Sequence, residues 1–243
     1  MNKIEVVNEK LDVDLNNDSY LIEVKDNEKF IGFNVKGNNK IVIVGDNCYL
    51  HLYFIFDINN ENTITVNCIG KNVTLAVKAS LYENSKFIFN YGVLANIDST
   101  NDFEISHMGD NSISEINNGG INLGSNKLYF KIDGRVYKAN ENVECRQNSK
   151  IINYKNGDSK IIPNLIIDTN EINASHSAYI GNIDKETKFY LESRGLTEEE
   201  INNLFVKSII LGKMNLDEEA SLFNEKLKEW WWYYASRRFS NIR

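Results

Sequence analysis

Apolar and polar residues alternate along most of this 243-residue chain, and this alternation constrains the fold more than any other feature. Because successive side chains of a β-strand point to opposite faces, a period of two is typical of strands that bury one face. The pattern extends from Lys40 to about Ile167 and is rich in β-branched and aromatic residues. We therefore expect strands, without intervening helices, over this stretch. Clear examples are Leu50, Leu52, Phe54 and Phe56, then Val73, Leu75, Val77 and Ala79, then Leu128, Phe130 and Ile132.

Short segments rich in asparagine and glycine separate these runs, as in Gly45-Asp46-Asn47, Gly70-Lys71-Asn72 and Asn117-Asn118-Gly119-Gly120. Asparagine and glycine tolerate positive φ, which tight corners require. Strands thus recur about every ten residues, a rhythm that fits either a β-sandwich or a β-solenoid. The composition does not decide between the two, and the absence of a clear sequence repeat favours the sandwich.

The pattern becomes helical after Gly181. Asp184 is suited to cap a short helix that ends at Gly195, because aspartate accepts first-turn N–H bonds and glycine adopts the left-handed conformation after a helix. Thr197 and Glu200 have the spacing of a capping box for a second helix. That helix is expected to present one apolar face, made of Ile201, Leu204, Phe205, Ser208 and Ile209, and to end near Gly212.

A third helix is expected at the C-terminal end, where Asn215 and Glu218 repeat the capping pattern. Its apolar residues recur at spacings of three and four, and they are Leu216, Ala220, Phe223, Leu227, Trp230 and Tyr234.

The run Trp230-Trp231-Trp232-Tyr233-Tyr234 surrounds the whole circumference of this helix, so that one face cannot bury all of it. Packing within the chain accounts for Trp230 and Tyr234. We expect Trp231, Trp232 and Tyr233 to be exposed and to contact a protein partner, with internal packing and membrane-surface contact as the alternatives.

Charge and composition exclude several classes of protein. A net charge of −7 argues against a general nucleic-acid binder, which needs a clustered basic surface. No apolar stretch approaches the roughly 18 residues that a membrane span requires. The first residues lack the pattern of a secretory signal peptide, so we expect a cytoplasmic protein.

The cysteines and the catalytic motifs point away from a self-contained active site. Cys48, Cys68 and Cys145 lie far apart, which predicts reduced thiols, with Cys68 buried in a strand. Cys48 and His51 would lie on opposite faces of one strand, which argues against a metal site there. No phosphate-binding Gly-x-x-x-x-Gly-Lys-Ser/Thr loop is present, and we expect a protein that is not an enzyme.

The stretch 162–212 contains a long composite motif. It includes Ile162-Pro163-Asn164-Leu165, then Ala174-Ser175-His176-Ser177-Ala178, then Phe189-Tyr190-Leu191-Glu192-Ser193-Arg194-Gly195. This resembles the C-terminal signature of the SufB/SufD family: a proline-led strand, a Ser-His turn, and a Phe-Tyr-Leu-x-Ser-Arg-Gly helix end followed by acidic residues. Upstream, Ile132-Asp133-Gly134-Arg135-Val136 is similar to the family's strand before the last solenoid turns.

The resemblance implies an all-β right-handed parallel β-helix with a C-terminal α-helical segment, and it thereby favours the solenoid, which we expect over residues 30–175 or so. Residues 1–183 would form the β-helix core with a short N-terminal lead-in. Residues 184–243 would form the helical region, which in this family docks onto a SufC-like ABC ATPase.

The resemblance also implies a scaffold subunit for iron–sulfur cluster assembly, with a SufB-like subunit or a second copy of this chain as dimer partner. His176 stands where the family's histidine contributes to the cluster site. A lone histidine cannot hold a cluster, so we expect a transient cluster at a subunit interface and none stably bound by the isolated chain.

The chain departs from both family patterns, and because it lacks the B-type cysteine and glutamates it is more similar to a compact SufD-like member. Ala174 stands where D-type members often have a cysteine, and Ser175 and Ser177 replace the glutamates that flank the B-type histidine. The B-type cysteine falls near Asn148 by spacing, with Cys145 three residues away. Much of the longer N-terminal region of D-type members has no counterpart.

The candidate partner-binding residues lie on the C-terminal helices. They are Phe189, Tyr190, Arg194, Gly195, Leu204, Phe205, Trp231 and Trp232. Two other functions stay open: a cytosolic β-solenoid structural or binding module, and a carbohydrate-active β-helix protein, which would need a cluster of acids.

Overall fold

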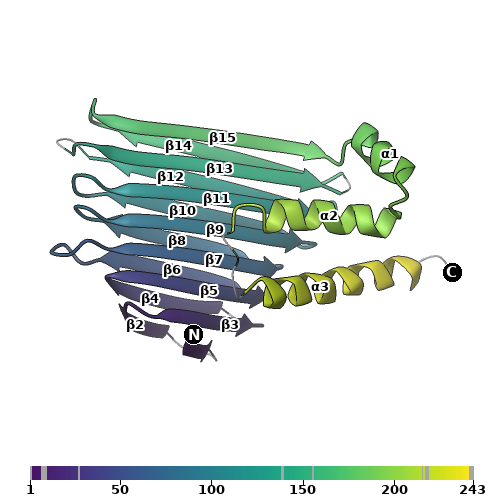
Figure 1. Cartoon of the computed structure of the whole chain (residues 1–243), viewed down its shortest axis with the longest axis horizontal. Helices are drawn as coiled ribbons and strands as arrows, with labels where there is room; N and C mark the ends of the chain where they lie inside the picture. The colour runs from purple at the N-terminus through teal and green to yellow at the C-terminus, as the bar shows by residue number, and fades with distance from the viewer. Residues whose placement is uncertain are drawn as a thin grey trace.

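Two parallel β-sheets, joined by a chain that crosses from one to the other after each strand, form the body of the protein (Figure 1). The computed structural model describes residues 2–6, 10–26, 28–137, 140–154, 156–214, 216 and 219–240, with the side chains of 5, 6 and 232–240 left aside. The eight-stranded sheet consists of β1 (Asn2–Val6), β3 (Ser19–Lys25), β5 (Asn38–Asp46), β7 (Thr63–Lys71), β9 (Lys86–Ala95), β11 (Ile113–Asn122), β13 (Val143–Asn153) and β15 (Ile172–Asn182). The seven-stranded sheet consists of β2 (Lys10–Asn16), β4 (Glu28–Lys36), β6 (Tyr49–Phe56), β8 (Thr74–Leu81), β10 (Ser99–His107), β12 (Lys127–Val136) and β14 (Asp158–Ile167).

This arrangement is a parallel β-helix, which confirms the fold implied by the resemblance. Each strand pairs in parallel with the strand two positions away along the chain, as in the pairs β11–β13 and β13–β15. Such pairing requires a crossover through the other sheet, whereas a β-sandwich would show antiparallel hairpins. The sandwich alternative is therefore wrong.

The β-helix begins much earlier than expected, at β1 rather than near residue 30. The alternation is present there, because Leu11, Val13 and Leu15 of β2 point toward the interior of the β-helix. Lysine and aspartate occupy the positions between them, and only Leu15 of the three is fully buried. These first strands thus resemble polar loops in the sequence, although they pair in register with β3 and β4.

The interior is a continuous apolar column in which aromatic rings of neighbouring rungs touch. Phe33 stacks on Phe54 with 4.8 Å between ring centroids, and Phe54 contacts Phe87 at 5.0 Å. Stacked and tilted ring pairs of this kind add to the stabilisation from burial alone. Cys68 lies in this column and is fully buried, as the alternation predicted.

Asparagines in the left-handed conformation form the corners between strands. Asn47 and Asn72 have φ angles of 47° and 53°, and Asn84 and Asn111 have φ angles of 57° and 55°. Corner residues of successive rungs bond to one another, since the Asn72 amide donates to Asn47 at 2.9 Å and the Asn111 amide donates to Asn84 at 3.1 Å. The positive φ expected at corners is confirmed at Asn47 and Asn72, whereas Asn117-Asn118-Gly119-Gly120, expected as a turn, lies within strand β11.

Three helices follow the β-helix: α1 (Lys185–Ser193), α2 (Glu198–Ile210) and α3 (Ala220–Ser240). The predicted caps are confirmed for the first two. The Asp184 carboxylate accepts from the Thr187 backbone at 2.9 Å, and Thr197 forms the capping box with Glu200. The expected capping pair Asn215 and Glu218 lies outside the described residues. Among the described helices, none combines the length and the hydrophobicity needed to cross a membrane.

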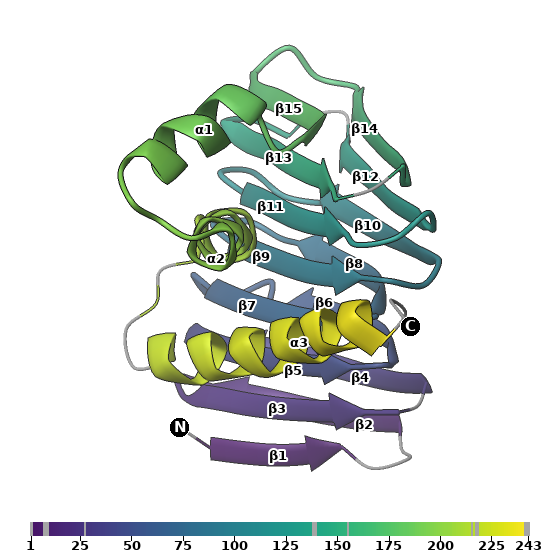
Figure 2. The same ribbon diagram turned by 90° about the vertical axis from the view of Figure 1, so that its right-hand side faces the viewer.

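Helices α2 and α3 lie against the outer face of the eight-stranded sheet (Figure 2). The sheet contributes a second apolar cluster on this face, which includes Val42, Val44, Ile69, Leu94, Ile121 and Ile152. A bidentate ion pair joins Lys40 on β5 to the almost fully buried Glu219, with both N–O distances 3.0 Å. The strands thus bury apolar side chains on both faces along this part of the sheet.

The predicted faces of two helices need correction. Helix α2 packs on the sheet through Val206, Ile209 and Ile210, while Leu204 is exposed. Trp231 was expected to be exposed but is buried, and its ring meets Tyr154 edge-on with centroids 5.7 Å apart. The sheet sets the buried face of both helices: Leu204 lies on the side of α2 that is turned away from it, and Trp231 belongs to the apolar cluster on it. The side chains of Trp232 and Tyr233 lie outside the described ones.

Two glycines allow α2 to approach the sheet, and this gives a first testable prediction. A Cβ at Gly92 would lie 2.7 Å from the Ile210 carbonyl oxygen, and a Cβ at Gly119 would collide with the Ile209 carbonyl oxygen. We expect Gly119→Ala to destabilise the protein by about 1–3 kcal/mol, because the backbone of α2 must move away. Thermal denaturation would then show a decrease of several degrees in Tm.

Gly181→Ala is the matched control, since its Cβ would meet only the end of the exposed Tyr179 side chain, which can move. Equal Tm values for Gly119→Ala and Gly181→Ala would contradict the close packing of α2 on the sheet.

Candidate functional site

The β-helix ends in a rung whose inner side is open. Strands β14 and β15 are the last members of their sheets, at the top of Figure 1. The register pairs Gln147 on β13 with His176 on β15, and Ile151 with Ile180. Gln147 and Ile151 are buried, whereas His176 and Ile180 are exposed although they occupy the same inward-facing columns. The open end therefore presents side chains that a further rung would cover.

His176 lies in the middle of strand β15 and not in a turn, which corrects the expectation drawn from the family motif. Its neighbours Ser175 and Ser177 point to the outer face, and the Ser177 hydroxyl donates to Asn148 at 3.1 Å. In the part of the chain that the structure describes, the imidazole has no hydrogen-bond partner. The His176 imidazole is therefore accessible to a metal ion, and the backbone hydrogen bonds of strand β15 hold the residue in place.

The interior beneath His176 is polar, in contrast to the aromatic column farther along. Cys145 and Gln147 face inward from β13, and Cys145 lies beside Ser114, its partner in the register of β11 and β13. The Gln147 amide donates to the Asn164 carbonyl at 3.1 Å, while its Oε1 is buried without a partner among the described residues. Burial raises the pKa of the Cys145 thiol, which keeps it protonated at neutral pH.

Gly134 provides the space for these two side chains. A Cβ at Gly134 would lie 2.7 Å from the Cys145 sulfur and 2.8 Å from Gln147 Nε2. The sequence motif contained Gly134, but it did not indicate that Cys145 and Gln147 belong to the same site. Only the register of β12, β13 and β15 brings them beneath His176.

The other cysteines and histidines are poor metal ligands. Cys48 and Cys68 are buried and unpaired, and burial raises the pKa of Cys48 to about 12. His107 is buried between the Ser112 and Ser114 hydroxyls, at 2.8 and 2.9 Å, and burial lowers its pKa to about 4. No group of three potential ligands occurs among the described side chains. Any cluster held at His176 would therefore need ligands from a second chain.

A second surface is formed by α1, the following turn and α2. Phe189 and Tyr190 are 72% and 54% exposed, and Leu204 is 50% exposed. The Arg194 guanidinium lies over the Tyr190 ring, 5.1 Å from its centroid. Gly195 follows with a φ of 89° and closes the turn, while Phe205 is half-buried.

An ion pair fixes α1 relative to α2 at this second surface. Lys188 on α1 bonds to Glu198 on α2 at 2.8 Å. Six of the eight predicted partner-binding residues thus come from this compact region. Trp231 lies elsewhere, on the face of α3 that packs on the sheet.

Comparisons with known proteins agree on the family. The family model described as "SUF system FeS cluster assembly, SufBD core domain" matches residues 60–209. The iron–sulfur cluster assembly protein SufD of Bacillus subtilis (strain 168) is 26% identical over 152 residues, which are 60% of this chain and 33% of that protein. An iron–sulfur cluster assembly SufBD family protein of Methanothermobacter thermautotrophicus is 30% identical over 134 residues, which are 53% of this chain and 32% of that protein.

The chain thus spans about a third of the length of the curated relatives that it matches. The matched residues extend from the turn before β7 to the end of α2, and they include the open end of the β-helix and His176. Because the family model covers more than half of the chain, this protein belongs to the SufBD family.

Proposed function

We propose that the protein is a non-enzymatic scaffold subunit of an iron–sulfur cluster assembly complex. The observation that carries this proposal is the open end of the β-helix, where His176 is exposed above a polar interior. An imidazole is a known replacement for thiolate in iron–sulfur clusters, and the curated relatives are named for cluster assembly. The cluster is cargo in this role, built at the site and passed on.

The open end is the surface at which a second β-helix would dock. The free edges of β14 and β15 present unpaired backbone groups, which readily pair with a strand of another chain. Exposed apolar side chains accompany them, namely Ile162, Ile166, Ile167, Tyr179 and Ile180. The partner would be a SufB-like subunit or a second copy of this chain, and its ligands would complete the set that His176 begins.

Reconstitution with such a partner tests this function. The assembled complex should acquire iron and sulfide, and replacement of His176 should prevent it. A complex whose iron and sulfide content does not depend on His176 would refute the role of the open end.

Helices α1 and α2 would carry the docking surface for a SufC-like ABC ATPase. Exposed aromatic residues beside an arginine are typical of residues that dominate binding energy at interfaces. Phe189, Tyr190 and Arg194 form such a group, and Leu204 extends it onto α2. This surface faces away from the sheet, so that it is free to accept a partner without any change in the β-helix.

A point variant tests this surface better than removal of the helices. Deletion of residues 184–243 would expose the apolar outer face of the sheet, which α2 and α3 cover, so that loss of binding and misfolding could not be separated. Phe189→Asp is expected to reduce co-purification of the ATPase by at least about tenfold, because interface aromatics commonly contribute 2 kcal/mol or more. Pull-down with the tagged ATPase measures the effect.

Ile58→Asp is the matched control, since Ile58 is an exposed apolar residue in the turn after β6, far from α1 in the fold. It should retain full binding, and both variants should melt at the wild-type temperature. Full ATPase binding by a folded Phe189→Asp variant would refute the assignment of this surface.

A further inference from the structure

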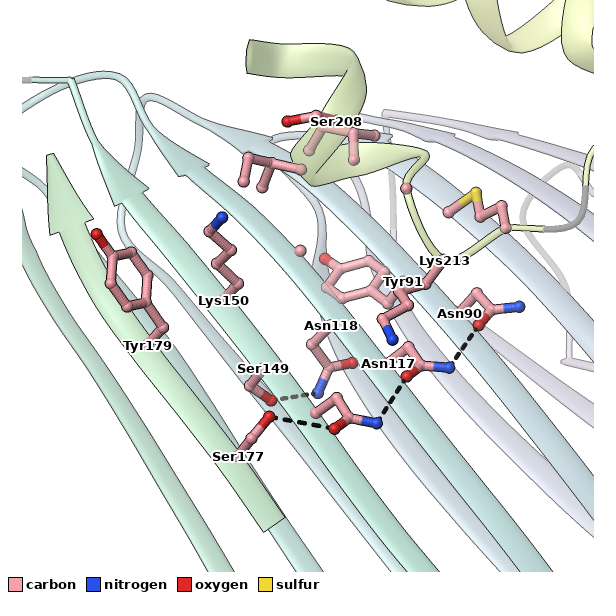
Figure 3. Close-up of a pocket in the computed structure, with 16 residues that line it drawn as sticks. Asn90, Tyr91, Asn117, Asn118, Ser149, Lys150, Ser177, Tyr179, Ser208 and Lys213 are labelled. Carbon is pink, nitrogen blue, oxygen red and sulfur yellow. Dashed lines mark hydrogen bonds between the residues drawn. The ribbon is translucent and has the colours of Figure 1, made fainter. Parts of the chain in front are cut away.

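A cavity lies between the outer face of the eight-stranded sheet and the C-terminal end of α2 (Figure 3). Its volume is about 330 Å³, and strands β9, β11, β13 and β15 form its floor. The end of α2 and the turn that follows, with Ser208, Lys213 and Met214, form the opposite wall. The cavity is on the outer side of the β-helix, whereas His176 points to the inner side, so the two sites are separate.

A ladder of side-chain amides crosses the floor. The Asn90 amide donates to Asn67 at 2.9 Å, Asn117 donates to Asn90 at 2.9 Å, and Asn148 donates to Asn117 at 3.0 Å. Ser177 completes the row by donating to Asn148 at 3.1 Å. Figure 3 shows the part of this row from Ser177 to Asn90 as one continuous line of side chains beneath the cavity.

The ladder leaves hydrogen-bond donors unused. A carboxamide nitrogen has two N–H groups, and the ladder uses one of them. The second N–H of Asn117 can reach Glu115, at 3.0 Å, but Asn90 and Asn148 have no second acceptor among the described residues. A ligand that only accepts hydrogen bonds would satisfy them.

The charge of the cavity has the sign that such a ligand requires. Two lysines line it, Lys150 from β13 and Lys213 from the turn after α2, and no aspartate or glutamate is among the described residues that line it. The whole chain has 34 acidic and 27 basic residues, so the charged residues of this described lining differ in sign from the net charge of the chain. Lys150 lies over the Tyr179 ring at 5.3 Å, and Lys213 extends from its turn toward the ladder in Figure 3.

We infer that this cavity binds a tetrahedral oxyanion, either inorganic phosphate or the phosphate group of a small phosphomonoester. The unused amide N–H groups would hold the oxygens, and the two ammonium groups would balance the charge. The volume leaves room beside the phosphate for a small carbon group against Ile210 and Met214. This binding does not depend on the proposed function in cluster assembly.

A simpler role for the lysines makes a different prediction. The C-terminal end of a helix carries partial negative charge, and lysines near it stabilise the helix without any ligand. In that case, removal of Lys150 and Lys213 would lower Tm by the same amount with and without phosphate.

Calorimetric titration of the full chain with inorganic phosphate, and separately with glycerol phosphate, tests the inference at constant ionic strength. The double variant Lys150→Gln/Lys213→Gln should bind phosphate at least about tenfold more weakly than wild type. The reason is that each lysine ammonium group would contribute a large part of the binding free energy through a charged hydrogen bond. Tm should rise with phosphate in wild type and stay constant in the double variant. The lower of the two Kd values shows whether the cavity prefers free phosphate or a phosphomonoester.

Lys160→Gln is the matched control, because Lys160 also lies over an aromatic ring, that of Tyr129 at 5.2 Å, but on the other sheet. It should bind phosphate as wild type does. Lys150→Arg/Lys213→Arg keeps both charges and should retain binding. Absence of binding to wild type, or equal binding by the glutamine double variant, would overturn the inference.

Discussion

The variant His176→Ala should fold like wild type and lose most of the iron and sulfide from the assembled complex. Because His176 is exposed and makes no hydrogen bond among the described residues, its loss should change the free energy of unfolding by about 0.5 kcal/mol or less. Removal of the proposed ligand should lower cluster content by about tenfold or more, since even outer-shell groups commonly change metal affinity by 10–100-fold. Iron and acid-labile sulfide analysis of the purified complex measures the effect.

His51→Ala provides the control for this variant. His51 is also partly exposed on a strand, β6, but it lies on the outer face beside Tyr49, with ring centroids 4.7 Å apart. Its replacement should leave the cluster content unchanged. If the His176→Ala complex contained as much iron and sulfide as wild type, His176 would be only a surface residue of the last strand.

The variant Ile180→Asp should abolish docking at the open end. Ile180 continues the inward column of Ile151 and is 42% exposed in the single chain, so that a docked partner would cover it. A carboxylate there would be buried without a counter-ion, which costs several kcal/mol, and the Kd for the partner should increase by about 100-fold or more. Sedimentation or native mass measurement of the partner complex gives this change.

Ile55→Asp is the matched control for Ile180→Asp, because Ile55 is an exposed isoleucine on strand β6 of the other sheet. This control should associate normally, and both variants should keep the wild-type Tm. Normal association of Ile180→Asp would place the partner surface elsewhere on the molecule.

The sequence predicted the strands and their corners well, because both depend on local physical chemistry. Alternation follows from the geometry of one strand, and asparagine corners follow from the φ angles of single residues. The caps at Asp184 and Thr197 were predicted for the same reason. The choice between sandwich and solenoid is a matter of which strands pair, and only the family resemblance indicated it.

The composition of the site depends on the register between strands and could not be predicted in the same way. Cys145 and Gln147 are separated from His176 by about thirty residues, and no local pattern states that they share one column of the interior. The buried position of Trp231 has a similar origin, since it depends on Tyr154 in the turn after β13. One pattern in the sequence does reflect the register. Asn90-Tyr91-Gly92 and Asn117-Asn118-Gly119 both have asparagine followed two residues later by glycine; the asparagines belong to the amide ladder, and the glycines contact α2.

We propose that this chain works as one subunit of a larger assembly, joined at the open end of its β-helix. Native mass spectrometry of the chain co-expressed with a SufB-like subunit and the ABC ATPase of the same organism tests it most directly. A complex that contains all three chains is expected, and Ile180→Asp should lose the SufB-like subunit from it. Isolation of this chain as a monomer, with both partners present and folded, would show that it is not a subunit of such an assembly.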